Sequence, residues 1–183
     1  MKVEFTESIY GWLYFTVNDW QGAFTCYWCP LRDLKHWLEA IAVGAMQTSF
    51  AYEPEASFDI RFNFSCAVTG EKRIYKGKTL YDRKEVDVFT ISEAIEACHY
   101  NDFAQELYEK SQVVPLITKD DDHIYLQEIV NRKQLVGAFY NALVTFFNSD
   151  KYKAEEWESG NWCGTSLSNF RSEIIETYLN EKY

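Results

Sequence analysis

The chain has 183 residues, a formal charge of −10, and a composition that is 47% hydrophobic and 17% aromatic. This length fits a single domain over residues 1–183, and the apolar content excludes a disordered chain. The negative charge disfavours binding to nucleic acid or to an anionic membrane surface, and it favours a cationic partner.

The chain shows no targeting or membrane-spanning segment. "MKVEFTES" at the N-terminus lacks the apolar core of a secretory signal. The longest uncharged runs, such as residues 40–52, are shorter than the ~18 residues that a membrane-spanning helix needs. The five cysteines have no regular spacing, so they do not form a disulfide framework. We therefore expect a protein of the reducing cytoplasm.

The first half of the chain predicts strands around one helix. Residues 9–18 are rich in aromatic and β-branched residues and predict a strand that ends at "NDWQG". Pro30 is suited to the first position of a helix, and Gly44 is placed to end it. Residues 58–68, "FDIRFNFSCAV", alternate strictly and predict a strand with one buried face. "TGEK" then predicts a turn over residues 69–72 into an antiparallel partner, "RIYKGKTLYD".

The second half predicts helices with recognisable caps. Thr90 and Glu93 have capping-box spacing, with Phe89 as a hydrophobic staple, so a helix is predicted to begin there. "HIYLQEIV" predicts a strand, and Asn131 and Gln134 then cap a helix with a wide apolar stripe. An amphipathic helix closes the chain. The order predicts an α+β fold, with a mainly antiparallel sheet of about 5–7 strands packed against about four helices.

A Cys-x-x-Cys pair, Cys26 and Cys29, is the first candidate for chemistry. A thioredoxin-type centre places its first cysteine at a helix N-terminus, where the thiolate is stabilised. Pro30 instead makes Cys29 the cap residue and leaves Cys26 outside the helix. The pair therefore fits two reduced thiols at a strand-to-helix junction better than a redox centre, although a thiol oxidoreductase stays as an alternative.

The sequence gives little support for a metal site or a cofactor site. A zinc site needs four ligands, and no second closely spaced pair accompanies Cys26 and Cys29. His36 is predicted on the outer side of its helix, and Cys66 on a buried strand face among phenylalanines. The "KDDDH" run lacks the spacing of a calcium loop. We therefore expect no metal and no cofactor, and the usual catalytic motifs are missing from the sequence.

Two clusters of acidic residues are candidates for a protein-binding surface. The first comprises Asp120, Asp121 and Asp122, and the second comprises Glu155, Glu156, Trp157 and Glu158. Both fit solvated loops, since runs of like charge are usually exposed. An aromatic residue ringed by charge also resembles the anchors of protein interfaces. These seven residues are the candidate partner-binding residues.

The chain resembles the small acidic immunity proteins of bacterial polymorphic-toxin and contact-dependent inhibition systems. The resemblance is carried by the aromatic N-terminal strand, by "PLRDLKHWLEAIAVG" and by "LVGAFYNALVTFFNSDKYKAEEWE". It is a general similarity in residue pattern over most of the chain and includes no diagnostic motif. Other bacterial families of unknown function share the same pattern. It implies a cytoplasmic protein that binds and blocks a toxin domain, without catalytic residues.

The leading hypothesis is therefore a non-enzymatic protein-binding module, an immunity protein that neutralises a basic toxin domain through an acidic, aromatic surface. The first alternative is the thiol oxidoreductase centred on Cys26 and Cys29. The second is a structural protein or homo-oligomer whose aromatic surface is self-complementary.

Overall fold

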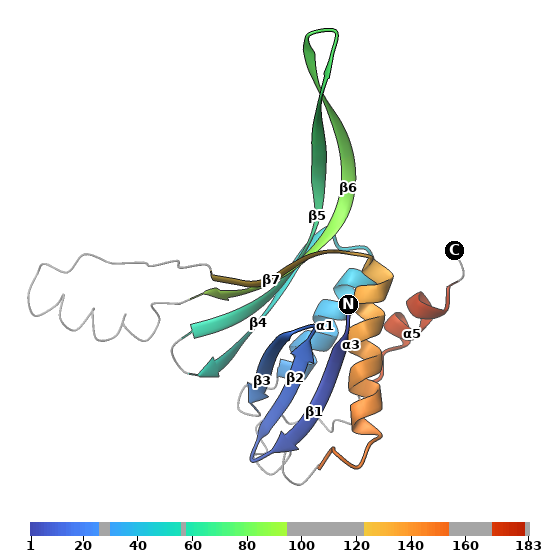
Figure 1. The fold of residues 1–183 in the computed structure, drawn as a ribbon. Helices are drawn as coiled ribbons and strands as arrows, with labels where there is room; N and C mark the ends of the chain where they lie inside the picture. The colour runs from blue at the N-terminus through green and yellow to red at the C-terminus, as the bar shows by residue number, and fades with distance from the viewer. Residues whose placement is uncertain (26–29, 56–57, 95–122, 154–169, 182–183) are drawn as a thin grey trace, which may run out of the picture.

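The computed structural model describes residues 1–25, 30–55, 58–94, 123–153 and 170–181. Within these ranges lie seven strands and three helices, and every strand pairing is antiparallel. The predicted α+β class with mainly antiparallel pairing is confirmed, whereas the prediction of a single sheet is wrong. The strands form two separate sheets, which we call sheet A and sheet B (Figure 1).

Sheet A is a meander of β1 (Val3–Ile9), β2 (Trp12–Val17) and β3 (Trp20–Thr25). Its tight turns use positive φ angles at Tyr10 and Gly11 (50° and 79°) and at Asn18 (51°), as two-residue hairpin turns require. The predicted single strand over residues 9–18 is therefore wrong at its start, because residues 10 and 11 form a turn. β1 was not predicted, since "VEFTESI" has too many polar residues to show a clear alternation.

Sheet B has the order β4-β5-β6-β7, with β4 (Gln47–Glu55), β5 (Phe58–Tyr75), β6 (Lys78–Ala94) and β7 (His123–Val130). β5 and β6 pair without interruption from Asp59 and Ala94 to Tyr75 and Lys78. They form a long hairpin that rises away from sheet A and the helices (Figure 1). This hairpin is much longer than its two neighbours in the sheet.

Two predictions about this hairpin are wrong. β5 continues straight through residues 69–72, and the turn lies at Lys76 and Gly77 instead. No helix begins at Thr90, because Thr90 is a central strand residue that pairs with Asn63 on one side and Gln127 on the other. Pairing on both sides of β6 outweighs the local capping signal, since β structure is decided by its neighbours more than by local sequence.

The helices largely follow the predictions. α1 (Pro30–Ala42) begins at Pro30 and is followed by Gly44 with φ of 99°, and it buries Leu31, Leu34, Trp37, Leu38 and Ile41. α3 (Arg132–Phe147) is capped by Asn131, whose Oδ1 accepts a hydrogen bond from the Gln134 N–H at 3.2 Å. α5 (Glu173–Asn180) is shorter than expected and is capped by Ser172.

The buried residues form one continuous aromatic core. Phe62 of β5 lies at its centre, with ring centroids 6.1 Å from both Phe15 of sheet A and Trp37 of α1, and 5.7 Å from Phe139 of α3. Edge-to-face and tilted arrangements dominate, which is the preferred geometry of packed rings. Sheet A, sheet B, α1 and α3 are therefore held by the same cluster of rings.

Candidate functional site

All the residues that the sequence nominated for binding or thiol chemistry lie outside the described residues. These are Cys26, Cys29, Asp120, Asp121, Asp122, Glu155, Glu156, Trp157 and Glu158. The described ranges contain no group of three or more histidine, cysteine, aspartate or glutamate side chains that would hold a metal ion. His36 is exposed, as predicted for the outer side of its helix. The site must therefore be sought among features that the sequence did not nominate.

The outer half of the β5–β6 hairpin, residues 67–86, projects from the body of the protein; we call it the arm. β4 pairs with β5 only as far as Ser65, and β7 pairs with β6 only from Asp87 onward. Beyond these points the two strands pair only with each other among the described residues. At ~3.3 Å per residue, the nine residues of one strand make an arm about 30 Å long.

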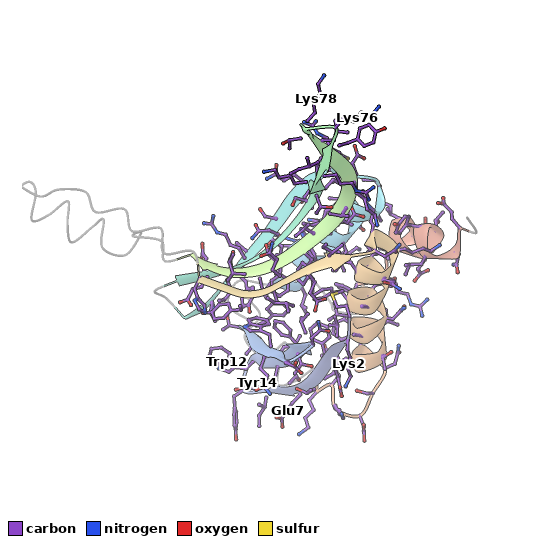
Figure 2. The ribbon with its side chains drawn as sticks, turned by 45° about the horizontal axis from the view of Figure 1, so that its top comes forward. Lys2, Glu7, Trp12, Tyr14, Lys76 and Lys78 are labelled. Atoms are coloured by element: carbon purple, nitrogen blue, oxygen red, sulfur yellow. The ribbon has the colours of Figure 1, made fainter. Side chains whose placement is uncertain are left out.

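The tip of the arm is a two-residue turn. Lys76 and Gly77 have φ angles of 49° and 73°, which match the turn type that best fits the twist of a hairpin. A side chain at Gly77 would meet nothing within 4 Å. Figure 2 shows Lys76 and Lys78 at the far end, pointing away from the protein. The tip is therefore open to a partner from all sides.

Every side chain described between Val68 and Glu85 is exposed. Four of them are large and apolar: Val68 (60%), Ile74 (74%), Tyr75 (61%) and Leu80 (51%). The predicted buried face of β5 therefore ends before Val68, because the strand leaves the core there. A two-stranded ribbon alone in water is only marginally stable. The register places Tyr75 and Leu80 on one face of the ribbon and Val68 and Ile74 on the other. Exposed apolar side chains on both faces are typical of an interaction surface.

The arm differs in charge from the rest of the chain. It contains six basic residues, Lys72, Arg73, Lys76, Lys78, Arg83 and Lys84, and three acidic ones, Glu71, Asp82 and Glu85. Its net charge is thus +3. Since the whole chain carries −10, the remainder carries −13. The protein therefore combines a basic arm with an acidic body, which its overall charge does not show.

A polar joint holds the base of the arm. The Cys66 S–H donates to Asp87 Oδ1 at 2.9 Å, and Arg132 Nη2 lies 3.1 Å from Cys66 Sγ and 3.6 Å from Asp87 Oδ1. Arg132 Nη1 also donates to the carbonyl oxygen of Ile41 at 3.2 Å, and its guanidinium lies 5.0 Å from the centre of the Phe64 ring. Arg132 thus connects both strands of the hairpin to the ends of α1 and α3.

This joint is suited to structure rather than to nucleophilic chemistry. The hydrogen bond to Asp87 is the main cause that raises the pKa of the Cys66 thiol, and burial and the negative charge of Asp87 add to it. A reactive cysteine requires the opposite shift, toward the thiolate. Cys66 is also less buried than predicted, and its thiol is hydrogen-bonded rather than packed only among rings.

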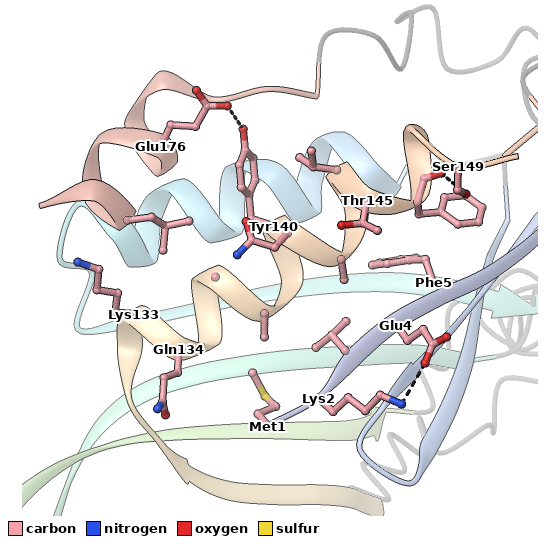
Figure 3. Close-up of a pocket in the computed structure, with 18 of the residues that line it drawn as sticks. Met1, Lys2, Glu4, Phe5, Lys133, Gln134, Tyr140, Thr145, Ser149 and Glu176 are labelled. Atoms are coloured by element: carbon pink, nitrogen blue, oxygen red, sulfur yellow. Dashed lines mark hydrogen bonds and ion pairs between the residues drawn. The ribbon is translucent and has the colours of Figure 1, made fainter. Parts of the chain in front are cut away.

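A groove between β1, α3 and α5 is the second candidate. It has a volume of about 1200 Å³ and is lined by the start of β1 and by residues of both helices (Figure 3). Two polar pairs lie in its lining: Lys2 Nζ lies 3.1 Å from Glu4, and the Tyr140 hydroxyl donates to Glu176 at 2.8 Å. Burial, as the largest cause, raises the pKa of Tyr140. The described residues lining the groove include no histidine or cysteine. This groove therefore offers packing surfaces and hydrogen-bonding groups.

Comparison with protein-family models, curated proteins and solved structures finds no significant match to this chain. No helix within the described ranges is long and apolar enough to cross a membrane.

The sequence did contain signals for the arm. The alternation of β5 ends after Val68, and a cluster of lysines and arginines surrounds "YKGK" at residues 75–78. A charge count in a short moving window would have separated this segment from its acidic surroundings.

Proposed function

We propose that this protein is a non-enzymatic protein-binding module and that the arm is its contact element. The observation that carries the proposal is the exposure of Ile74, Tyr75 and Leu80 on a ribbon that packs against nothing in the described part of the chain. Burial of these side chains against a partner would remove apolar surface from water and stabilise the ribbon.

The backbone of the arm offers a second type of contact. The outer edges of its two strands have no neighbouring strand among the described residues, so their N–H and C=O groups are available to an extended segment of a partner. Such strand addition supplies affinity through the main chain, while side chains on alternate positions supply specificity. Exposed lysines often prevent this pairing at sheet edges. On the arm, the lysines would instead restrict the pairing to acidic partners.

The resemblance to immunity proteins supports a toxin domain as the partner, and this identity is part of the proposal. Binding alone blocks a toxin, so the role needs neither a catalytic residue nor a cofactor. The acidic clusters of residues 120–122 and 155–158 would add a second, oppositely charged contact to that of the arm. A partner contacted by both would need an acidic region and a basic region.

The proposal is tested by site-specific photo-crosslinking in the producing cell. A photoreactive amino acid replaces Tyr75 on the arm, and a matched variant replaces Tyr10, which is 86% exposed in a turn of sheet A. We expect a discrete protein adduct at position 75 and none at position 10. The adduct partner, once purified, should bind the wild-type chain and bind Ile74→Ser/Leu80→Ser at least about tenfold more weakly. Equal crosslinking at both positions, or none at position 75, would refute the arm as a contact element.

A further inference from the structure

We infer that the partner of the arm adds an extended, acidic segment to the outer edge of β5, antiparallel to that strand. Four residues of β5 then select the side chains of the segment: Val68, Gly70, Lys72 and Ile74. This inference rests on the proposed role of the arm as a contact element, and it specifies what the same partner presents to the arm. We call the outer edge of β5 from Val68 to Ile74 the β5 edge.

The register of the hairpin determines which backbone groups of β5 point outward. At the base of the arm, the Cys66 N–H donates to the carbonyl oxygen of Met46 at 2.8 Å, so the backbone of Cys66 points away from β6. β5 and β6 then pair without a bulge up to the turn at Lys76 and Gly77. Because the direction alternates along an antiparallel ladder, the N–H and C=O groups that face outward belong to Val68, Gly70, Lys72 and Ile74.

The β5 edge continues the line of hydrogen bonds that β5 makes with β4. β4 begins at Gln47, which pairs with Ser65, and β5 extends past this point into the arm (Figure 1). An antiparallel segment on the β5 edge runs in the same direction as β4, from the tip of the arm toward Met46. The side chains of Met46 and of the nearby Val43 are 62% and 70% exposed. The end of the segment therefore meets apolar surface at the base of the arm.

The outer edge of β6 is less suited to an acidic segment. Its outward-facing residues are those paired with the β5 edge: Thr79, Tyr81, Arg83 and Glu85. Arg83 and Glu85 have charges of opposite sign, so they would attract and repel the same carboxylates. On the β5 edge, Lys72 is the one charged residue that faces outward, and it is positive.

The four residues of the β5 edge define the side chains that the segment needs. Residues directly opposite each other on neighbouring strands have Cβ atoms about 5 Å apart and interact. The exposed Val68 and Ile74 favour apolar residues, and the Lys72 ammonium, which has no ion pair among the described residues, favours a carboxylate. Gly70 leaves a space that an aromatic side chain on the opposite strand can fill. In its N-to-C direction, the segment therefore presents an apolar, an acidic, an aromatic and an apolar residue at alternate positions.

Binding of a fluorescent synthetic peptide to the purified full chain tests the inference. The peptide has valine, glutamate, phenylalanine and valine at its alternate positions, with threonine between them. We expect saturable binding by fluorescence anisotropy, and we expect binding about three- to tenfold weaker when lysine replaces the glutamate of the peptide. Lys72→Glu should reverse this preference, whereas the matched variant Lys72→Arg should preserve it.

Two proline variants distinguish the two edges of the arm. Gly70 and Thr79 are both exposed, and their N–H groups both point outward, so proline at either position removes no hydrogen bond of the hairpin. Gly70→Pro should weaken peptide binding by at least about tenfold, because it removes a donor and places a ring on the β5 edge. Thr79→Pro, the matched control on β6, should change binding by less than about twofold. Thermal unfolding verifies that both variants are folded, and the Lys72 variants test the same edge without altering the backbone.

Several results would overturn the inference. These are no saturable binding of the peptide to the wild-type chain, no change in its charge preference in Lys72→Glu, equal loss of binding in both proline variants, and loss in Thr79→Pro alone. The last result would place the segment on β6.

Failure here is distinguishable from failure of the proposed function. A crosslinked adduct at position 75 that disappears in Gly70→Pro and persists in Thr79→Pro supports both proposals. An adduct that persists in both proline variants leaves the arm as a contact element and overturns strand addition at the β5 edge.

Discussion

Two of the arginine–aspartate pairs among the described residues share an N–O distance of 3.6 Å but differ strongly in burial. The side chains of Arg132 and Asp87 are 19% and 22% exposed, whereas those of Arg32 and Asp33 are 60% and 51% exposed. Double-mutant cycles on the two pairs therefore separate the effect of burial from that of distance. The comparison tests whether the joint at the base of the arm stabilises the fold.

The expected magnitudes follow from the contacts. Arg132→Met removes the ion pair with Asp87 and the bond to the Ile41 carbonyl, and it leaves the carboxylate without its cation. Hydrogen bonds to charged groups contribute about 1.5–3 kcal/mol, and loss of one partner of a fully buried pair costs about 3–5 kcal/mol. Since water still reaches about a fifth of each side chain, we predict that the free energy of unfolding falls by about 2–3 kcal/mol.

Urea unfolding of the single and double variants measures the result. We predict a coupling energy of about 1–2 kcal/mol between Arg132→Met and Asp87→Asn, and below ~0.5 kcal/mol between Arg32→Met and Asp33→Asn. The slope of the unfolding free energy against urea should not change, because the joint contains few residues. Coupling energies that agree within about 0.5 kcal/mol for the two pairs would show that burial does not strengthen the joint.

Two further predictions concern packing. A Cβ at Gly22 would lie 2.6 Å from a ring carbon of Trp20, so Gly22→Ala should destabilise the fold by about 1–3 kcal/mol in urea unfolding. Gly137 lies in helix α3, and a Cβ there would make an ordinary contact of 3.4 Å with Leu179 of α5, so Gly137→Ala should stabilise the fold by about 0.5–1 kcal/mol. Destabilisation by both substitutions would contradict the contact argument. Burial raises the pKa of Tyr52, so the unfolded chain loses that proton first and stability should fall as the pH rises above about 10. Tyr52→Phe should flatten this decline in pH-dependent unfolding, and Tyr10→Phe, an exposed control, should not.

The elements that the sequence predicted well are those whose signals are local. The helix from Pro30 and the helix capped by Asn131 each combine a start signal with an apolar stripe that the core buries. The alternation over residues 58–64 likewise matches the buried face of β5, since Ile60, Phe62 and Phe64 are all buried. In each case the residues that give the sequence pattern are the same residues that determine the local structure.

The errors arise where distant partners decide the outcome. Thr90 and Glu93 satisfy the spacing of a helix cap, but β5 and β7 hold this segment as a central strand. Gly70 in "TGEK" and Gly77 in "YKGK" are equally plausible turn residues in sequence. The register of β5 against β6 selects the second, because pairing Phe62 with Ile91 and Phe64 with Phe89 fixes where the strands must meet.

The overall charge of −10 does not describe the local charge that a partner would meet at each part of this protein. Electrostatic fields in water at physiological salt fall off over about 8 Å, and the arm extends about 30 Å from the acidic body. A molecule that approaches the tip therefore senses the lysines at positions 76 and 78 and not the carboxylates of the body. We therefore expect each region to be recognised according to its own local charge. Under the proposed function, the expectation of a basic partner concerns the acidic body, whereas the arm would contact a partner with an acidic surface.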